Sequence, residues 1–372
     1  MKKLLTATLL VFSLFLSSCT TEKNNENTIK ITDCLNRTVL IPKNPKRVVV
    51  GDHYLEMFAV GGENVYENIV GWSATTWVDW RNDIYLKFAS STPRLKELTD
   101  VGLTANQTFS IEVFLKLDPD LLIIPTYQYY ALDSGIQNAI EKAGIPIVVI
   151  DFSTGTKELH NKSISIIGQV FNHKDRADSI NKLYNKYNSL LENTLKDINT
   201  DDKTTYLEKV ANGPLIYDET FGGSDWAPIL DRGGANNISK KYFKSFGTAD
   251  TEILLTENPE YIFLAGSTWP KKPEAVQMGF SIEKSKAISS GLNIVENRIG
   301  WKHLNAVEKK QVYLLHHGFI RSVLDFVPAI YIAQKLHPTL FTDLDATLIA
   351  EEFYDEYLPV DFSGSWLVEL YE

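Results

Sequence analysis

The sequence predicts an α/β protein with two lobes joined by one long helix and a ligand cleft between the lobes. Two observations predict it: a long amphipathic stretch near the middle of the chain, and a segment repeated on either side. Between Lys174 and Ile198 apolar residues recur in steps of three and four, which marks one stripe of a helix. No Gly or Pro lies between Gly168 and Gly213 to break it. The stretch would form a rod of about 37 Å at about 1.5 Å per residue, although an ordinary surface helix shows the same pattern.

The repeated segment covers Ile111–Pro125 and Thr251–Ala265. Each copy has a glutamate in second place, Glu112 or Glu252, then a short apolar helix, a turn containing proline and a continuous apolar run. Such a run is typical of a strand covered on both faces. The copies begin 140 residues apart, too far for a solenoid, so they indicate two lobes of similar plan. The predicted domains are a first lobe at 29–173, the helix at 174–198 and a second lobe at 199–372.

Other elements follow in chain order. Alternating residues predict a hairpin at Ile29–Ile41, followed by the first core strand, Val48–Val50. The charged segment Trp80–Thr99 is expected to be a loop. In the second lobe, apolar runs predict strands at Leu215–Tyr217 and Val312–Leu315. The last part, Phe326–Glu372, is expected to be helical at first, to end in the segments Tyr357–Val360 and Ser365–Trp366, and to wrap the second lobe.

The N-terminus has the features of an export signal. Two lysines precede a short apolar run that ends in Leu16, and small residues follow. The run is shorter than the about 20 apolar residues that span a membrane. Residues 1–18 are therefore predicted to be a signal peptide, and 19–28 a flexible tether. Cys19 after Leu-Ser-Ser resembles the lipobox of bacterial lipoproteins, which implies a lipid anchor on the outer face of the cytoplasmic membrane or in the periplasm. An unlipidated cysteine near an ordinary cleavage site is the weaker alternative.

Composition and motifs exclude several classes. Lys and Arg number 37 against 47 Asp and Glu, a net charge of −10 that argues against a nucleic-acid partner. Apart from Cys19 the only cysteine is Cys34, so no disulfide is expected. The chain contains no P-loop, no G-x-S-x-G and no H-E-x-x-H, so neither an enzyme nor a resident cofactor or metal is predicted. The protein is expected to be a monomer.

Several segments together resemble a known family. The opening Ile31–Val50, the Gly233–Asn237 turn, the Gly300–Val307 segment and Leu358–Val360 occur in the order found in iron-siderophore and cobalamin substrate-binding proteins of ABC importers. Asn36 replaces the family's usual glycine, and asparagine tolerates the same left-handed turn. The resemblance implies two Rossmann-like lobes joined by one long helix, and an ABC permease dimer as partner. It also implies that Glu112 and Glu252 dock on the two permease subunits, although a first-turn glutamate also suits the helix dipole.

Ligands of open α/β sheets bind beyond the carboxyl ends of the strands. Aromatic and polar residues are dense in the loops expected there. The candidate ligand-binding residues are His53, Tyr54, Trp72, Trp77, Tyr127 and Tyr129 in the first lobe, and Phe221, Trp226, Trp269, His316 and Arg321 in the second. Some are expected to be core residues. Of His316 and its neighbour His317 at most one should face the cleft, because they point in opposite directions along a strand. Arg81 and Arg94 are expected to be solvated, and Arg321 could grip an oxyanion.

The ligand expected from the resemblance is a small-molecule metal complex, first a ferric siderophore, with cobalamin, haem or an oxyanion as alternatives. A receptor for bare Zn²⁺ or Mn²⁺ is another, in which His53 and His316 with Asp52 or Asp218 would supply ligands. The many Trp and Tyr residues favour a larger, partly organic ligand. Because a helix linker resists bending, the lobes are expected to move only a few degrees on binding.

Overall fold

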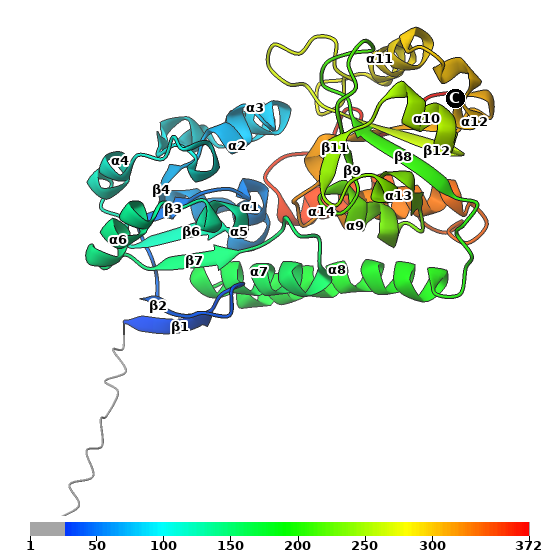
Figure 1. Ribbon diagram of the computed structural model, residues 1–372. Coiled ribbons are helices and arrows are strands. Elements are labelled where there is room, and N and C mark those ends of the chain that lie inside the picture. The colour runs from blue at the N-terminus through cyan, green and yellow to red at the C-terminus, as the bar shows by residue number, and fades with distance from the viewer. Residues whose placement is uncertain (1–26, 372) are drawn as a thin grey trace, which may run out of the picture.

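The computed structural model describes residues 27–371, so the predicted signal peptide, Cys19 and most of the tether lie outside the described residues. It contains two α/β lobes joined by helix α8 (Lys174–Leu195), which runs beneath both lobes in Figure 1. The predicted two-lobe α/β fold with an inter-lobe helix is therefore confirmed. Thr28 already belongs to the first strand, so it is not part of the tether. No helix within residues 27–371 is long and apolar enough to span a bilayer.

The first lobe contains a five-stranded parallel sheet in the order β5-β4-β3-β6-β7. A hairpin, β1 (Thr28–Thr32) and β2 (Thr38–Pro42), precedes it, and Asn36 in its turn adopts φ 59°, the left-handed conformation expected there. The strands of the sheet are β3 (Val48–Val50), β4 (Ile69–Trp72), β5 (Thr99–Asp100), β6 (Leu121–Pro125) and β7 (Ile147–Ile150). The helices are α1 (Tyr54–Gly61), α2 (Thr75–Val78), α3 (Asn82–Ser91), α4 (Ile111–Lys116), α5 (Thr126–Tyr130), α6 (Ser134–Lys142) and α7 (Lys157–Val170).

Helix α3 corrects the prediction of a loop between Trp80 and Thr99. Ile84 and Phe88, four residues apart, lie on its buried face, so the segment does carry a helical stripe. Polar and charged residues beside that stripe, among them Asn82, Asp83 and Lys87, conceal it in the sequence. This helix belongs to the part of the first lobe that faces the second.

The second lobe contains a mixed seven-stranded sheet in which β8, β12 and β13 form a parallel centre and antiparallel strands flank it. The strands are β8 (Thr204–Lys209), β9 (Glu219–Phe221), β10 (Asn236–Asn237), β11 (Phe246–Thr248), β12 (Tyr261–Gly266), β13 (Val312–His316) and β14 (Leu367–Glu369). The helices are α9 (Trp226–Arg232), α10 (Thr251–Glu257), α11 (Lys284–Asn297), α12 (Asn305–Glu308), α13 (Phe326–Leu336) and α14 (Ala346–Tyr357).

One strand predicted for this lobe is wrong. Leu215–Tyr217 forms no strand: Leu215 is 89% exposed, and Arg298 bonds the backbone carbonyl of Ile216, so the segment is a loop despite its apolar side chains. The C-terminal part is helical up to the end of α14 at Tyr357, and the short strand β14, which was not predicted, then pairs with β13 at the sheet edge.

The two copies of the repeat fold alike. Helices α4 and α10 each begin after a side-chain cap, Ser110 or Asp250. Each is followed by a residue in the left-handed conformation, Asp118 with φ 47° or Asn258 with φ 42°. A buried proline comes next, and then a strand buried along its whole length, β6 or β12. The second residue of each helix is an exposed glutamate.

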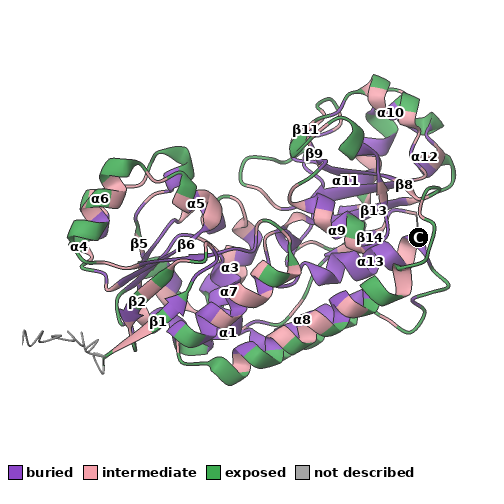
Figure 2. Ribbon diagram, turned by 60° about the horizontal axis from the view of Figure 1, so that its bottom comes forward, coloured by how far each residue is buried: buried purple, intermediate pink, exposed green. Residues whose placement is uncertain are grey.

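Helix α8 packs against both lobes. It contacts α7 and α1 of the first lobe and α9 and α13 of the second. Figure 2 shows its buried face turned toward the lobes and its exposed face outward. One continuous apolar cluster runs from Ile31 in the first lobe through Ile180 and Tyr184 on α8 to Trp226 and Phe326 in the second. The helix has 22 residues and ends three residues before the predicted Ile198.

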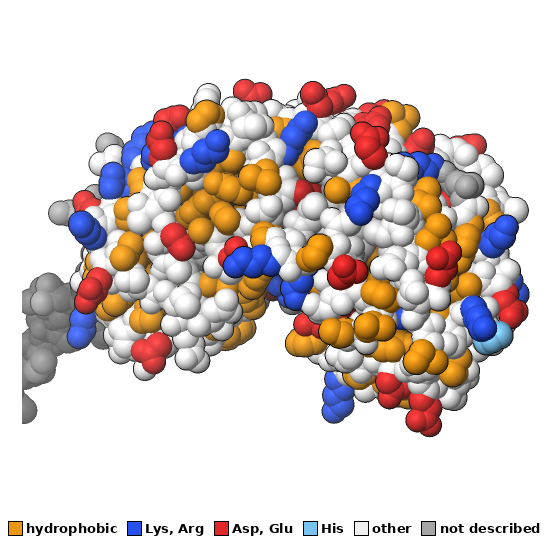
Figure 3. All heavy atoms as spheres, turned by 90° about the horizontal axis from the view of Figure 1, so that it is seen from above, with side chains coloured by type: hydrophobic (Ala, Val, Ile, Leu, Met, Phe, Trp, Pro, Cys, Tyr) orange, Lys and Arg blue, Asp and Glu red, His pale blue; other side chains and the backbone are white. Residues whose placement is uncertain are grey.

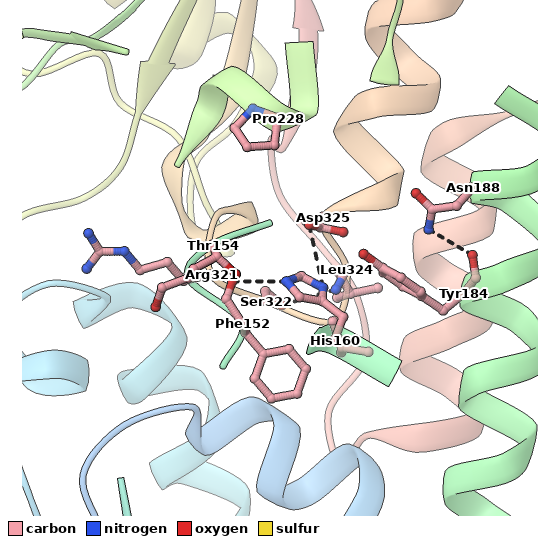
Figure 4. Close-up of polar contacts among 12 residues, drawn as sticks. Phe152, Thr154, His160, Tyr184, Asn188, Pro228, Arg321, Ser322, Leu324 and Asp325 are labelled. Carbon is pink, nitrogen blue, oxygen red and sulfur yellow. Dashed lines mark hydrogen bonds and ion pairs between the residues drawn. The ribbon is translucent and has the colours of Figure 1, made fainter. Parts of the chain in front are cut away.

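A buried polar cluster also joins the lobes at α8. His160 of α7 lies between the carbonyl of Phe152, 3.0 Å from Nε2, and the carboxylate of Asp325, 3.6 Å from Nδ1 (Figure 4). Arg232 of α9 forms an ion pair with Asp325 at 2.7 Å and donates to the Tyr184 hydroxyl. Residues of α7, α8, α9 and the segment before α13 are thus held together at the junction.

Candidate functional site

A pocket of about 260 Å³ lies between the lobes, and we call it the inner pocket. Strands β8, β12 and β13 end at it, and the turn between α2 and α3 supplies the first lobe's side. Figure 3 shows a notch between the lobes with Lys and Arg side chains at its inner end. The lining residues are Trp80, Arg81, Lys209, Glu219, Phe221, Asp225, Trp269, His317, Ile320 and Arg321.

Arg321 and Asp225 form an ion pair in the inner pocket, with Nε 2.7 Å from Oδ1. Burial opposes the charge of Arg321, but the Asp225 carboxylate outweighs it and raises the pKa of Arg321. The guanidinium also lies 5.5 Å from the centre of the Tyr127 ring. Both members of the ion pair have a positive φ, 55° for Arg321 and 52° for Asp225. Such conformations are uncommon for residues other than glycine and tend to occur at functional sites.

Arg81 supplies a second guanidinium, and the expectation that it is solvated is wrong. It donates a 2.7 Å hydrogen bond across the lobes to the carbonyl of Ile320. Burial lowers the pKa of Arg81, and the carboxylate of Asp52 opposes that effect. Among residues 27–371 no carboxylate lies within ion-pair distance of Arg81. Its positive charge is therefore available to a bound anion.

Lys209 and His317 complete the polar wall. Lys209, the last residue of β8, pairs with Glu219 at 2.6 Å. His317 accepts a hydrogen bond at Nδ1 from the indole N–H of Trp226, 3.1 Å away. Burial lowers the pKa of His317 well below its usual value, and the neighbouring cations Lys209, Arg81 and Arg321 lower it further. The ring is thus neutral near pH 7, with Nε2 left to carry its proton.

Two tryptophans from opposite lobes close one side of the inner pocket. The Trp269 indole N–H donates to the backbone carbonyl of Trp80 at 3.2 Å, and its ring lies edge-on to His317 at 5.6 Å. Beyond them lies an outer pocket of about 450 Å³. It is lined by Asp79, Trp80, Lys209, Ala211, Asn212, Asp218, Trp269, Pro270, Lys271 and Lys272.

Of the candidate ligand-binding residues, the structure brings Phe221, Trp269 and Arg321 together on the inner pocket. Tyr127 lies behind Arg321, and its hydroxyl donates to the Asp52 carboxylate at 2.8 Å. Trp226 is fully buried behind His317.

The aromatic residues of the first lobe mostly form its core. Tyr54 stacks on Trp77 at 5.1 Å, and Trp72 contacts both rings; all three are buried. Tyr129 lies elsewhere, with the Arg37 guanidinium 4.3 Å above its ring. These residues lie in α1, β4, α2 and α5 and not in the loops expected from the sequence, and none of them lines the inner pocket.

The two histidine candidates are also buried. His53, with Tyr54 and Trp77, lines a small cavity of about 20 Å³ that shares Arg81 and Arg321 with the inner pocket, and the Nε2 atom of His53 has no hydrogen-bond partner among the described residues. His316 is fully buried, with Nε2 2.9 Å from the Asp83 carboxylate of α3. It is His317 that lines the inner pocket, as alternation along β13 permits.

The four groups considered for a bare metal do not converge. His316 pairs with Asp83, and Asp52 accepts from Tyr127. The Asp218 carboxylate accepts hydrogen bonds from the backbone N–H groups of Ala211 and Asn212. Within residues 27–371 no group of three or more His, Cys, Asp or Glu side chains could hold a metal ion.

The sequence does not predict the pocket residues Trp80, Arg81, Lys209, Glu219 and Asp225. Lys209 could have been predicted, because it is the last residue of a buried strand and such strand ends border the ligand sites of α/β sheets. The others depend on how the lobes face each other. Glu112 and Glu252 are exposed on α4 and α10, in the outer parts of the two lobes on the side away from α8 (Figure 1).

Comparisons with known proteins agree with this arrangement. A family model described as periplasmic binding protein matches residues 48–317. The chain is 32% identical to the solved TroA-like periplasmic binding protein FepB from Veillonella parvula, with a TM-score of 0.87 over 92% of this chain and 99% of that one. It is 24% identical to the molybdate-binding protein MolA of Haemophilus influenzae, covering 88% of this chain and 90% of that protein. It is 25% identical to the iron(3+)-hydroxamate-binding protein YxeB of Bacillus subtilis, covering 74% of each.

Proposed function

The chain belongs to the periplasmic binding protein family, and on that premise we propose that it captures an anionic metal chelate, first a ferric siderophore, for an ABC importer. Proteins of this family bind substrates for transport and are not enzymes, so the prediction of no catalytic activity is confirmed. The chelate would be passed to a permease dimer in the cytoplasmic membrane.

The observation that carries the proposal is the convergence of Arg81, Lys209 and Arg321 on one pocket between the lobes. Two carboxylates in the pocket, Glu219 and Asp225, form ion pairs with Lys209 and Arg321. The lining therefore keeps a net positive charge, that of Arg81. The whole chain has a formal net charge of −10, so the charge of the pocket is opposite in sign to that of the protein. A pocket of this kind selects anions.

The aromatic wall supports a ligand with an organic part. Trp80, Phe221 and Trp269 offer flat apolar surface next to the cations. Ligand sites commonly combine such surface with a few placed polar groups. The relative named for iron(3+)-hydroxamate binding supports a ferric chelate as the ligand, while the preference for an anionic one rests on the cations of the inner pocket. Cobalamin and haem remain alternatives of similar character.

A compact oxyanion is the second candidate. The relative named for molybdate binding aligns over 88% of this chain, and two guanidiniums with the neutral His317 could hold a small tetrahedral anion by hydrogen bonds. For this candidate the aromatic wall would have no direct use.

Isolating the protein from its native host and identifying the bound molecule tests the proposal. A ferric siderophore would give a broad visible absorption band and a matching iron-chelate mass after release. A Soret band would indicate haem, and a corrinoid spectrum cobalamin. A colourless protein that releases molybdate or a bare metal ion would contradict the chelate assignment.

We also propose that the protein is exported and held at the membrane by a lipid on Cys19. Expression with a labelled fatty acid should give a labelled protein, and Cys19→Ser should remove the label. Cys34→Ser is the matched control, since that thiol is buried 3.3 Å from the Ser163 hydroxyl. Label that persists in Cys19→Ser would contradict the anchor.

A further inference from the structure

The inner and outer pockets are neighbours separated by one inter-lobe contact. They share the lining residues Trp80, Lys209 and Trp269. The hydrogen bond from the Trp269 indole to the Trp80 carbonyl joins the second lobe to the first at this boundary. The Trp80 and Trp269 side chains therefore line both pockets.

The outer pocket has its own chemistry. Ala211, Pro270 and the two indoles give it apolar walls, while Lys271 and Lys272 lie on its lining. Lys272 bonds the side-chain oxygen of Asn212. Among the described residues Lys271 has no ion-pair partner.

Among the described residues, neither acidic residue of the outer pocket, Asp79 or Asp218, forms an ion pair with these lysines. The Asp218 carboxylate is engaged by the backbone N–H of Ala211 at 2.7 Å and of Asn212 at 2.8 Å, and by the Asn212 side chain. Asp79 is exposed at the edge. The pocket therefore offers flat apolar surface bordered by ammonium groups, which suits an organic arm that carries carbonyl or anionic oxygens.

We propose that the outer pocket is a second subsite, which holds the organic periphery of the same ligand whose charged, metal-bearing head occupies the inner pocket. This rests on the proposed function and extends it: the ligand is a bipartite chelate with an arm, and Trp269 and Trp80 lie where head and arm meet. The volume of the inner pocket is consistent with its holding only part of the ligand. The inner pocket, about 260 Å³, is smaller than the roughly 300–1,000 Å³ typical of sites for whole organic ligands.

Two probes of different size test the subsite: molybdate, which needs only the inner pocket, and an anionic ferric tricatecholate, which needs both. Affinities are measured by titration calorimetry on the full-length protein and on the double variant Lys271→Ser/Lys272→Ser. The matched control is Lys286→Ser/Lys302→Ser, which removes the same charge from exposed positions of the second lobe that line neither pocket. A third variant, Ala211→Leu, fills the outer pocket sterically, and its thermal unfolding is recorded to confirm that it folds.

The outer-pocket variants should weaken ferric tricatecholate binding about fivefold or more and change molybdate binding less than twofold. The control pair should change neither. The subsite is disproved if the chelate binds and is weakened by Arg321→Ala but not by the outer-pocket variants, or if both probes weaken equally. If the unmodified protein binds molybdate alone, the bipartite ligand is ruled out. Binding of neither probe would instead count against the proposed function itself.

Discussion

Arg321 and Asp225 form an ion pair on the wall of the inner pocket, with Arg321 Nε 2.7 Å from Asp225 Oδ1. The backbone of each residue has a positive φ, which few residues other than glycine adopt. Arg321 is 30% exposed and Asp225 only 8%, so the cation is the partner that a ligand reaches. Asp225 orients the guanidinium of Arg321 and accepts its hydrogen bond in the ligand-free protein.

Arg321→Ala is expected to weaken binding of an anionic ferric tricatecholate by about tenfold or more. The substitution removes a charged hydrogen-bond donor, worth about 1.5–3 kcal/mol, and leaves Asp225 unpaired beside the anion. Titration calorimetry measures the change. Asp225→Asn is the informative companion, because it removes the competing carboxylate and should leave affinity equal or tighter. Unchanged affinity in Arg321→Ala would remove this residue from the site.

Arg298→Met is expected to lower the free energy of unfolding by about 3–5 kcal/mol. Arg298 and Glu208 form a bidentate ion pair at 2.6 and 2.7 Å, with side-chain exposures of 1% and 0%. Removing one partner leaves the other charge buried and unpaired. Urea denaturation monitored by fluorescence checks the value. Adding Glu208→Gln should recover part of the loss, and a double variant that is worse than the single would contradict this account.

Stability should fall as the pH drops below about 6.5. Burial lowers the pKa of His160 in the fold, and Arg232 adds to this effect while Asp325 opposes it. An unfolded histidine titrates near 6.5, so below that pH the unfolded chain binds more protons and the native state loses stability. His160→Gln should reduce the slope of unfolding free energy between pH 6.5 and 5.5 by up to about 1.4 kcal/mol per pH unit. The exposed His303→Gln is the control, and an equal effect there would refute the assignment.

The two lobes are expected to reorient by only a few degrees when ligand binds. The apolar cluster that crosses α8, and the polar cluster of Arg232 and Asp325 beside it, would both be disrupted by a large rotation. Small-angle scattering of free and loaded protein should give nearly superimposable profiles. A closure as large as that of hinged sugar-binding proteins would contradict this prediction.

Glu112→Gln/Glu252→Gln is expected to reduce uptake through the permease while leaving ligand affinity unchanged. The two carboxylates are exposed on equivalent helices of the two lobes, placed to orient the protein on a two-fold partner. Transport in proteoliposomes and calorimetry measure the two quantities separately. Glu63→Gln/Glu308→Gln changes the same number of exposed charges and should leave uptake intact. An equal loss in both pairs would indicate a general charge effect.

Local patterns were sufficient where one segment determines its own structure. The helical stripe of α8, the buried strands β6 and β12, and the left-handed turn at Asn36 each follow from residue order within a short window. Prediction was wrong for Leu215–Tyr217, where exposure is decided by what packs nearby and not by side-chain type. Tyr54, Trp72 and Trp77 are candidate ligand-binding residues by sequence and are buried in the structure. Here too the neighbouring residues, and not the side-chain type, decide the exposure.

The sequence by itself determined two duplicated α/β lobes and the helix between them, because periodicity and turn residues act over a few neighbours. Only the tertiary structure decided which side chains face the ligand. Arg81 and Trp80 come from one lobe, and His317 and Trp269 from the other. Their meeting depends on the angle at which α8 and the shared core hold the lobes, and that angle is set by packing between residues far apart in the chain.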